Sequence, residues 1–171
     1  MEALTGYIRT NYPHPTSGTS SQQDRSDRDA ILTVLARRQH KDDHPLDLHG
    51  TDLAGANLSN ADLSGTNLKG TNLNGADLMK TDLSDADLSS AILQNAHLKK
   101  ANLRSAKFDK ADLQYCDLER IENWRKIKSI NVARTFGITN APNGFQNWAS
   151  ENGAIVDYIT DIEWQRRKAE A

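Results

Sequence analysis

Residues 46–85 read LDLHGTDLAGANLSNADLSGTNLKGTNLNGADLMKTDLSD, and one five-residue phrase accounts for almost all of this stretch. The phrase consists of a small residue, Asp or Asn, Leu and two variable residues, and it persists to Glu122. Its central apolar residue recurs every five positions without an insertion, at Leu48, Leu53, Leu58, Leu63, Leu68, Leu73, Leu78, Leu83, Leu88, Leu93, Leu98, Leu103, Phe108, Leu113 and Leu118. These fifteen repeats in a single phase decide the fold class.

A period of five fits neither an α-helix, with 3.6 residues per turn, nor a long strand with alternating side chains. The chain must therefore turn at regular intervals. The central residue and the small residue two positions before it can point inward, while the other three point to solvent. Such a unit buries its apolar side only against neighbouring units, so the repeats are expected to stack.

The A-[D/N]-L-x-x pattern resembles the pentapeptide-repeat family. This resemblance implies an all-β solenoid, namely a right-handed quadrilateral β-helix with four repeats in each coil. Residues twenty apart would then stack in columns, one of which contains Leu48, Leu68, Leu88 and Phe108. Glycines such as Gly50 and Gly75 end the early repeats, where a tight corner favours a residue without a Cβ.

Four segments are predicted along the chain. Residues 1–25 are rich in polar residues and are expected to form a flexible amino-terminal segment. Residues 26–45 contain an amphipathic pattern, DAILTVLARR, followed by a polar link, and predict a capping helix. Residues 46–122 form the repeat stretch. Residues 123–171 form a carboxyl-terminal cap and tail, so that short α-helical caps close both ends.

The carboxyl-terminal segment begins where the five-residue phase fails. Its phrase IENWRKIKSINVARTFGITNAPNGFQNWASENGAI resembles the closing segment of cyanobacterial pentapeptide-repeat proteins. The apolar residues after Glu122 predict a last degenerate turn, and Phe145, Trp148 and Ala149 predict one face of a short helix. Ile155, Ile159 and Ile162 follow at helical spacing, and this tail is expected to lie on the prism rather than on another subunit.

Composition excludes several classes of protein. The 171 residues carry a formal charge of −2, which points to neither a strongly basic nor a strongly acidic partner. No signal peptide and no membrane span is expected. The single cysteine, Cys116, falls in a small-residue position of a repeat, where a buried structural thiol is expected. A cytoplasmic location is the default.

The outward positions change charge along the repeats. Seven aspartates precede Ile92, whereas residues 93–110 are basic. A candidate interaction surface follows from these residues, together with Ile92 in a position usually given to Asp or Asn: Ile92, His97, Lys99, Lys100, Arg104, Lys107 and Lys110. The alternative is that these cations only keep the surface soluble, because no aromatic residues or phosphate-binding loop accompany them.

No catalytic, metal-binding or cofactor-binding residues are predicted. The segment HKDDH at residues 40–44, with Asp47 and His49, has metal-binding residue types but matches no zinc-site spacing, so solvated turn residues are preferred. No nucleophile with a base, no phosphate-cradling loop and no cavity in a leucine-filled prism is expected. The chain is therefore predicted not to be an enzyme and to need no cofactor.

The sequence favours a non-enzymatic repeat scaffold that presents a protein-interaction surface to an unidentified protein partner. The alternative, a role that some members of the resembling family play, is a DNA-mimicking inhibitor or protector of gyrase, a topoisomerase. Neither nucleic acid nor a membrane is expected as a partner. A monomer is expected, with a dimer through the carboxyl-terminal tail as the alternative.

Overall fold

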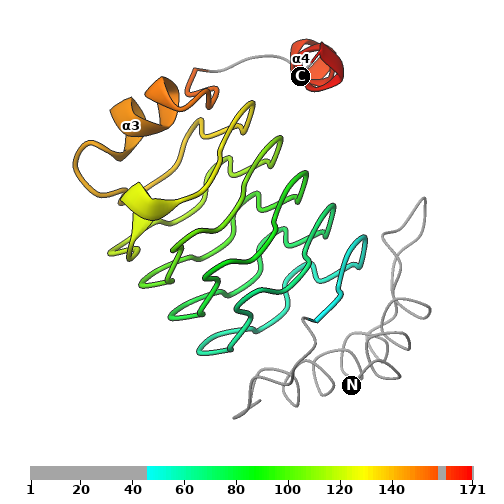
Figure 1. The fold of residues 1–171 in the computed structure, drawn as a ribbon, viewed down its shortest axis with the longest axis vertical. Coiled ribbons are helices and arrows are strands. Elements are labelled where there is room, and N and C mark those ends of the chain that lie inside the picture. The colour runs from blue at the N-terminus through cyan, green and yellow to red at the C-terminus, as the bar shows by residue number, and fades with distance from the viewer. Residues whose placement is uncertain (1–45, 158–160, 171) are drawn as a thin grey trace.

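The computed structural model of the protein describes residues 46–157 and 161–170. Within these ranges the chain winds through successive coils that stack on one another, with helices α3 and α4 beyond the last coils (Figure 1). The predicted flexible segment at residues 1–25 and the predicted capping helix within residues 26–45 lie outside the described residues.

Neighbouring coils are joined by parallel bridges between residues twenty apart. The bridges run from Asp47↔Asn67 to Asn102↔Glu122 without a change of register. Each bridge is supported by backbone hydrogen bonds in both directions; for example, the Leu48 N–H donates to the Asn67 carbonyl at 2.8 Å and the Asn67 N–H donates to the Leu46 carbonyl at 2.8 Å. Four repeats therefore complete one coil, as predicted.

The core consists of the central residues of the repeats. Leu48 and Phe108 are both fully buried, and the other thirteen central residues are at most 2% exposed. The smaller inward residues fill the space between the leucine columns, and threonines among them also satisfy backbone groups: the hydroxyl of Thr71 donates to the Leu48 carbonyl at 2.8 Å. Cys116 takes the same position, with its Sγ 2.8 Å from the Leu93 carbonyl, and burial raises the pKa of its thiol. The prediction of a buried structural cysteine is confirmed.

Each repeat ends in a tight turn whose third residue has a positive φ, as a type II turn requires. At the first corner the Thr51 N–H donates to the Leu48 carbonyl at 3.3 Å, and Gly50 has φ +62°. Later corners place residues with side chains in the same conformation, such as Lys80 at φ +58°. Where Asp or Asn precedes the central leucine, it stabilises the corner, because its side-chain oxygen accepts a hydrogen bond from the backbone two residues on; Asp52 accepts from Ala54 N–H at 3.1 Å.

The ladder continues past Glu122, where the sequence analysis ends the repeat stretch. The next bridges are Lys107↔Ser129, Asp112↔Arg134 and Asp117↔Thr139, which join residues 22 apart. The short 3₁₀-helix η1, Trp124–Lys126, lies where the extra residues are accommodated. Trp124 and Ile130 are buried, so this degenerate coil shares the core of the regular ones, as the predicted last turn requires.

Helix α3, Phe145–Glu151, packs on the last coil. Phe145 is 1% exposed, and its ring lies 5.6 Å from the ring of Trp124 in an edge arrangement. Phe145 and Ala149 belong to the same apolar cluster as the leucine columns. The predicted short helix is therefore confirmed, with Phe145 and Ala149 on its buried face.

The prediction that Ile155 belongs to a helical tail is wrong. Ile155 forms a parallel bridge with Arg134, and its N–H donates to the Ala133 carbonyl at 2.7 Å. Helix α4 begins later, spans Asp161–Glu170 and has Trp164 as its only buried residue. Ile162 is 85% exposed, so it does not face the solenoid. The tail nevertheless lies on the prism, as expected, because the Trp164 indole N–H donates to the Val132 carbonyl at 3.2 Å.

Candidate interaction surface

The outward positions of the solenoid are held in register by ladders of side-chain amides and carboxylates. Asn67 Nδ2 donates to Asp47 Oδ1 at 3.0 Å, and Asn72 Nδ2 donates to Asp52 Oδ1 at 2.8 Å one side further on. Successive coils are spaced like strands in a sheet, about 4.8 Å apart. Side chains twenty residues apart therefore form rows with a fixed spacing.

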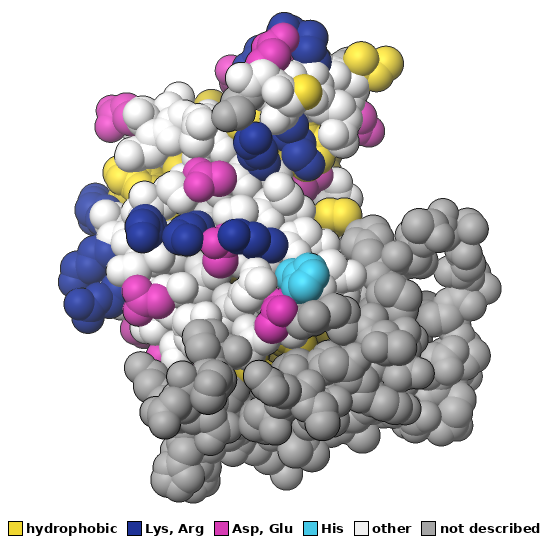
Figure 2. Space-filling model, turned by 45° about the vertical axis from the view of Figure 1, so that its right-hand side comes forward, with side chains coloured by type: hydrophobic (Ala, Val, Ile, Leu, Met, Phe, Trp, Pro, Cys, Tyr) yellow, Lys and Arg dark blue, Asp and Glu magenta, His cyan; other side chains and the backbone are white. Residues whose placement is uncertain are grey.

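The predicted basic residues share one level of the solenoid but face different sides of it. His97, Lys99 and Lys100 flank Leu98, and Arg104 follows Leu103 on the next side. Lys107 and Lys110 flank Phe108 on the side after that, while Ile92 precedes Leu93 and is only half-buried. The structure thus distributes these residues around the coil. Figure 2 shows one face on which Lys and Arg side chains are mixed with Asp and Glu.

Two of these cations already have a carboxylate partner. Lys99 pairs with Glu119, and Lys107 pairs with Asp87 at 3.0 Å. Lys69 Nζ also lies 3.4 Å from Asp87 Oδ2. Burial raises the pKa of Asp87, but hydrogen bonds from Ser89 and Lys107 outweigh it and lower that pKa to about 2. Lys99 and Lys107 therefore stabilise neighbouring coils and offer less charge to a partner.

A row of cations lies instead along one corner of the prism, between the sides of Leu98 and Leu103. We call it the cationic edge; it consists of Lys80, Lys100 and Arg120, twenty residues apart. The Lys80 N–H donates to the Lys99 carbonyl and the Lys100 N–H to the Glu119 carbonyl, both at 2.8 Å, which holds the row in register. Arg120 lies 3.6 Å from Glu119, whereas Lys80 and Lys100 form no ion pair within residues 46–157 and 161–170.

A second polar cluster, which is not among the residues predicted from the sequence, lies beneath α4. Arg134 and Asp112 occupy outward positions but are only 5% and 2% exposed. Arg134 Nη1 lies 3.3 Å from Asp112 Oδ2 and 2.8 Å from Asp161 Oδ1 on α4. Gln94 Nε2 donates to the same Asp112 oxygen at 2.7 Å. A sequence signal was present, since Arg134 and Asp112 have opposite charges in neighbouring positions of one column, but the loss of phase after Glu122 concealed it.

Helix α4 rests on this cluster mainly through one aromatic ring. The Trp164 ring lies 4.5 Å from the guanidinium carbon of Arg134 and 4.4 Å from Nζ of Lys168. Burial lowers the pKa of Lys168. The charge of Asp112 raises this pKa, whereas the charges of Lys110 and Arg134 lower it further.

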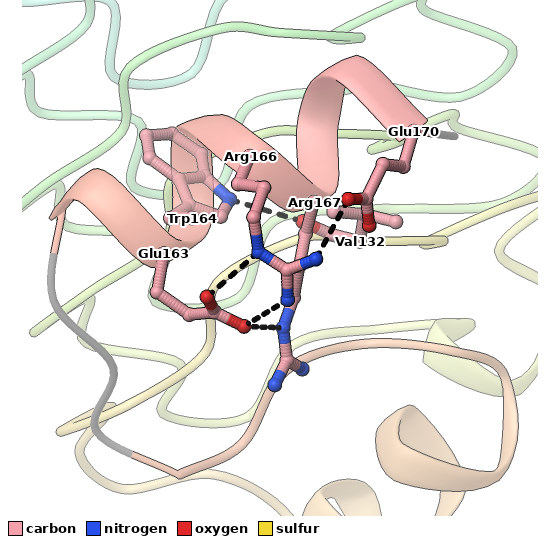
Figure 3. A network of polar contacts seen from close by, with 6 residues as sticks. All are labelled: Val132, Glu163, Trp164, Arg166, Arg167 and Glu170. Carbon is pink, nitrogen blue, oxygen red and sulfur yellow. Dashed lines mark hydrogen bonds and ion pairs between the residues drawn. The ribbon is translucent and has the colours of Figure 1, made fainter.

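Besides the Trp164 hydrogen bond to the solenoid, α4 has ion pairs within the helix. In Figure 3 Trp164 points toward Val132, while Glu163 binds Arg166 and Arg167 within the helix. The hydrogen bonds from these two arginines lower the pKa of Glu163 to about 2.

Nothing in the described ranges resembles a metal centre. No group of three His, Cys, Asp or Glu side chains there is arranged to hold a metal ion. Asp47 Oδ1 instead lies 2.8 Å from His49 Nδ1 at the first corner. Residues 40–44, which hold the remaining His and Asp side chains of the cluster considered above, lie outside the described residues. Neither α3 nor α4, nor another helix of the described residues, is long and apolar enough to span a bilayer.

Comparison with known proteins agrees with this architecture. The family model for pentapeptide repeats matches residues 47–85 and 81–120. Residues 47–120 are therefore pentapeptide repeats of this family. A similar solved structure is the pentapeptide-repeat protein Rfr23 of the cyanobacterium Cyanothece 51142, with 34% identity over 54% of this chain and 55% of that chain and a TM-score of 0.40.

Two further solved relatives have known roles of their own. HetL of the cyanobacterium Nostoc sp. strain PCC 7120, involved in heterocyst differentiation regulation, is 30% identical over 56% of this chain and 46% of its own, with a TM-score of 0.32. QnrB1, a plasmid-mediated fluoroquinolone resistance protein, is 14% identical over 71% of this chain and 72% of its own, with a TM-score of 0.37. The chain thus spans about half the length of Rfr23 and HetL. No curated protein sequence matches it.

Proposed function

We propose that this pentapeptide-repeat protein is a non-enzymatic scaffold that binds an acidic surface of a protein partner through the cationic edge. The proposal takes the solenoid as the right-handed, four-sided β-helix of the family, closed at its carboxyl end by α3. The observation that carries it is the pair Lys80 and Lys100, which lie in register on consecutive coils without a carboxylate among the described residues. The proposed place of action is the cytoplasm.

Two physical considerations support binding through this row. The backbone under each residue is fixed by the ladder, so binding orders only side chains and costs less entropy than ordering a loop. Single surface ion pairs contribute only about 0–1 kcal/mol, so a surface that binds through charge needs several of them in a defined array. Arg104 is exposed on the adjoining side, and we include it in the proposed surface.

The same row argues against the gyrase alternative. Duplex DNA carries one negative charge per about 1.7 Å of its axis, so a mimic needs a dense acidic array. The repeat stretch carries eight Lys and Arg against twelve Asp and Glu, and three of these cations occupy one corner. We therefore expect the purified protein neither to inhibit DNA supercoiling by gyrase nor to protect gyrase from a quinolone.

The test compares two double variants of the intact chain. Lys80→Gln with Lys100→Gln removes two charges from the cationic edge, and Lys126→Gln with Lys128→Gln removes two exposed charges from the next coil. The unaltered chain should bind poly-L-glutamate and co-purify with a protein from its native cells, and only the first variant should lose both. Equal losses in both variants would contradict a specific surface. Inhibition of gyrase by the unaltered chain would favour the DNA mimic.

A further inference from the structure

The sequence contains three Asn-Gly pairs, at residues 74–75, 143–144 and 152–153. In such a pair the backbone nitrogen of glycine can attack the side-chain carbonyl carbon of the preceding asparagine, because glycine has no Cβ to hinder the approach. The attack needs a backbone N–H that is free to move toward that carbon. All six residues are exposed, so solvent access does not distinguish the three pairs.

The hydrogen bonds of the three glycine N–H groups do distinguish them. The Gly75 N–H donates to the Gln94 carbonyl at 2.8 Å, inside the ladder between coils. The Gly153 N–H donates to the Ser150 carbonyl at 3.1 Å, and the Asn152 side-chain amide is itself held by the Trp148 carbonyl at 2.8 Å. The Gly144 N–H has no acceptor in the part of the chain that the structure describes.

We propose that Asn143 is a site of spontaneous deamidation, at which the protein changes its own backbone without an enzyme. The Gly144 nitrogen forms a bond to Cγ of Asn143 and loses its proton to solvent, and the side-chain nitrogen takes up a proton from solvent and leaves as ammonia. The resulting succinimide ring then takes up one water molecule. Opening at one carbonyl gives aspartate, and opening at the other gives isoaspartate, in which the backbone runs through the former side chain.

The two products affect the structure differently. Residues 142–145 form a turn in which the Phe145 N–H donates to the Pro142 carbonyl at 3.0 Å, with Gly144 at φ 84°. Aspartate keeps the length of this turn. Isoaspartate adds one atom to the backbone, which the turn cannot hold while Phe145 stays buried against Trp124. The isoaspartyl form therefore loosens α3 from the last coil and uncovers the apolar end of the solenoid.

The experiment follows the three pairs in one sample. The full-length protein is incubated at mildly alkaline pH under native conditions, and peptide mass spectrometry measures the conversion of amide to acid at each asparagine. Asn143 should convert at least about fivefold faster than Asn74 or Asn152, because opening their hydrogen bonds must precede reaction. In concentrated urea the three rates should become similar, since the dipeptide is the same.

A second measurement tests the structural consequence. Isoaspartyl-containing protein, separated from the aspartyl form, should show altered tryptophan fluorescence and increased self-association. The variant Asn143→Asp, which has the charge but not the longer backbone, should behave like the unmodified chain. Native conversion at Asn74 or Asn152 as fast as at Asn143 would overturn the assignment of the site. An isoaspartyl form that matches Asn143→Asp in both measurements would overturn the loosening of α3.

Discussion

Alanine substitutions at Gly137 and Gly75 can separate the effect of steric crowding at a corner from the effect of backbone strain. Gly137 has φ +71° and Gly75 has φ +64°, so alanine at either position adopts a conformation that L-residues disfavour. That conformation costs roughly 1–2 kcal/mol, of which about 0.4–1 kcal/mol is offset because alanine restricts the unfolded chain. A methyl group at Gly75 would have no atom within 4 Å, whereas at Gly137 it would lie 2.5 Å from Cδ1 of Tyr115.

Gly75→Ala should therefore lower the free energy of unfolding by about 1 kcal/mol. Gly137→Ala must also displace the Tyr115 ring from its edge contact with Phe136, at a centroid distance of 6.0 Å. Such contacts contribute about 0.5–1.5 kcal/mol, so the total loss should reach about 2 kcal/mol. Urea unfolding monitored by circular dichroism measures both values. Tyr115→Ala should remove the excess in a double-mutant cycle. Equal losses at the two glycines, or an excess that persists without Tyr115, would refute the reasoning.

Three further predictions follow from the core, the acidic ladder and the tail. Leu83→Lys should abolish cooperative unfolding, because Leu83 is fully buried, whereas Ser84→Lys should change stability by less than about 0.5 kcal/mol; similar effects would contradict the inward and outward assignment. Because the pKa of Asp87 is lowered to about 2 from 3.8, its ionised form stabilises the fold above pH 3.8, and this contribution is lost as pH falls toward 2. Asp87→Asn should lower the free energy of unfolding by about 2 kcal/mol at neutral pH and should reduce the dependence of that free energy on pH between 3.8 and 2. An unchanged acid transition would show that Asp87 is not responsible. Trp164→Ala should release α4, so that trypsin cleaves after Arg166 and Arg167 faster while the urea midpoint of the solenoid hardly moves; a large fall in that midpoint would show that α4 is part of the cooperative core.

The regular part of the fold follows directly from the sequence. A five-residue apolar period with small inward neighbours leaves one arrangement for the leucines, and all fifteen central positions are buried as predicted. The corners were also predictable where glycine ends a repeat. They were less so at Lys80 or Tyr115, because those residues adopt positive φ only under the constraint of the coils on either side.

The carboxyl-terminal part could be predicted only in outline. Apolar residues and a turn signal predict Phe145 and Ala149 on a short helix, since local spacing decides that element. The assignment of Ile155 depends instead on a bridge to Arg134, 21 residues earlier, and on a coil lengthened to 22 residues. The helical spacing of Ile155 with Ile162 is therefore a coincidence of sequence, and Ile162 points to solvent.

The candidate surface shows the same division between local and distant causes. The sequence identifies a basic level of the solenoid, but whether each cation is neutralised depends on residues twenty positions away. Lys107 meets Asp87 in its own row, and Lys99 meets Glu119, whereas Lys80 and Lys100 have each other as neighbours along the corner. The charges of residues twenty positions apart therefore decide which cations are paired. They can be compared in the sequence once the number of repeats per coil is known.

That spacing also determines how a partner would bind the cationic edge. Two unit charges about 4.8 Å apart repel each other by roughly 0.9 kcal/mol in water, and extended side chains reduce this by moving apart. A partner carboxylate between Lys80 and Lys100 would replace repulsion with attraction to both. Because Lys80 is exposed and Lys100 is only half-buried, salt screens the gain over about 8–10 Å at ionic strengths of 0.1–0.15 M. Binding of poly-L-glutamate by the unaltered chain should therefore weaken steeply with added salt. The residual binding of the Lys80→Gln and Lys100→Gln double variant should depend much less on salt, and equal salt dependence in the two proteins would show that the edge does not form the contact.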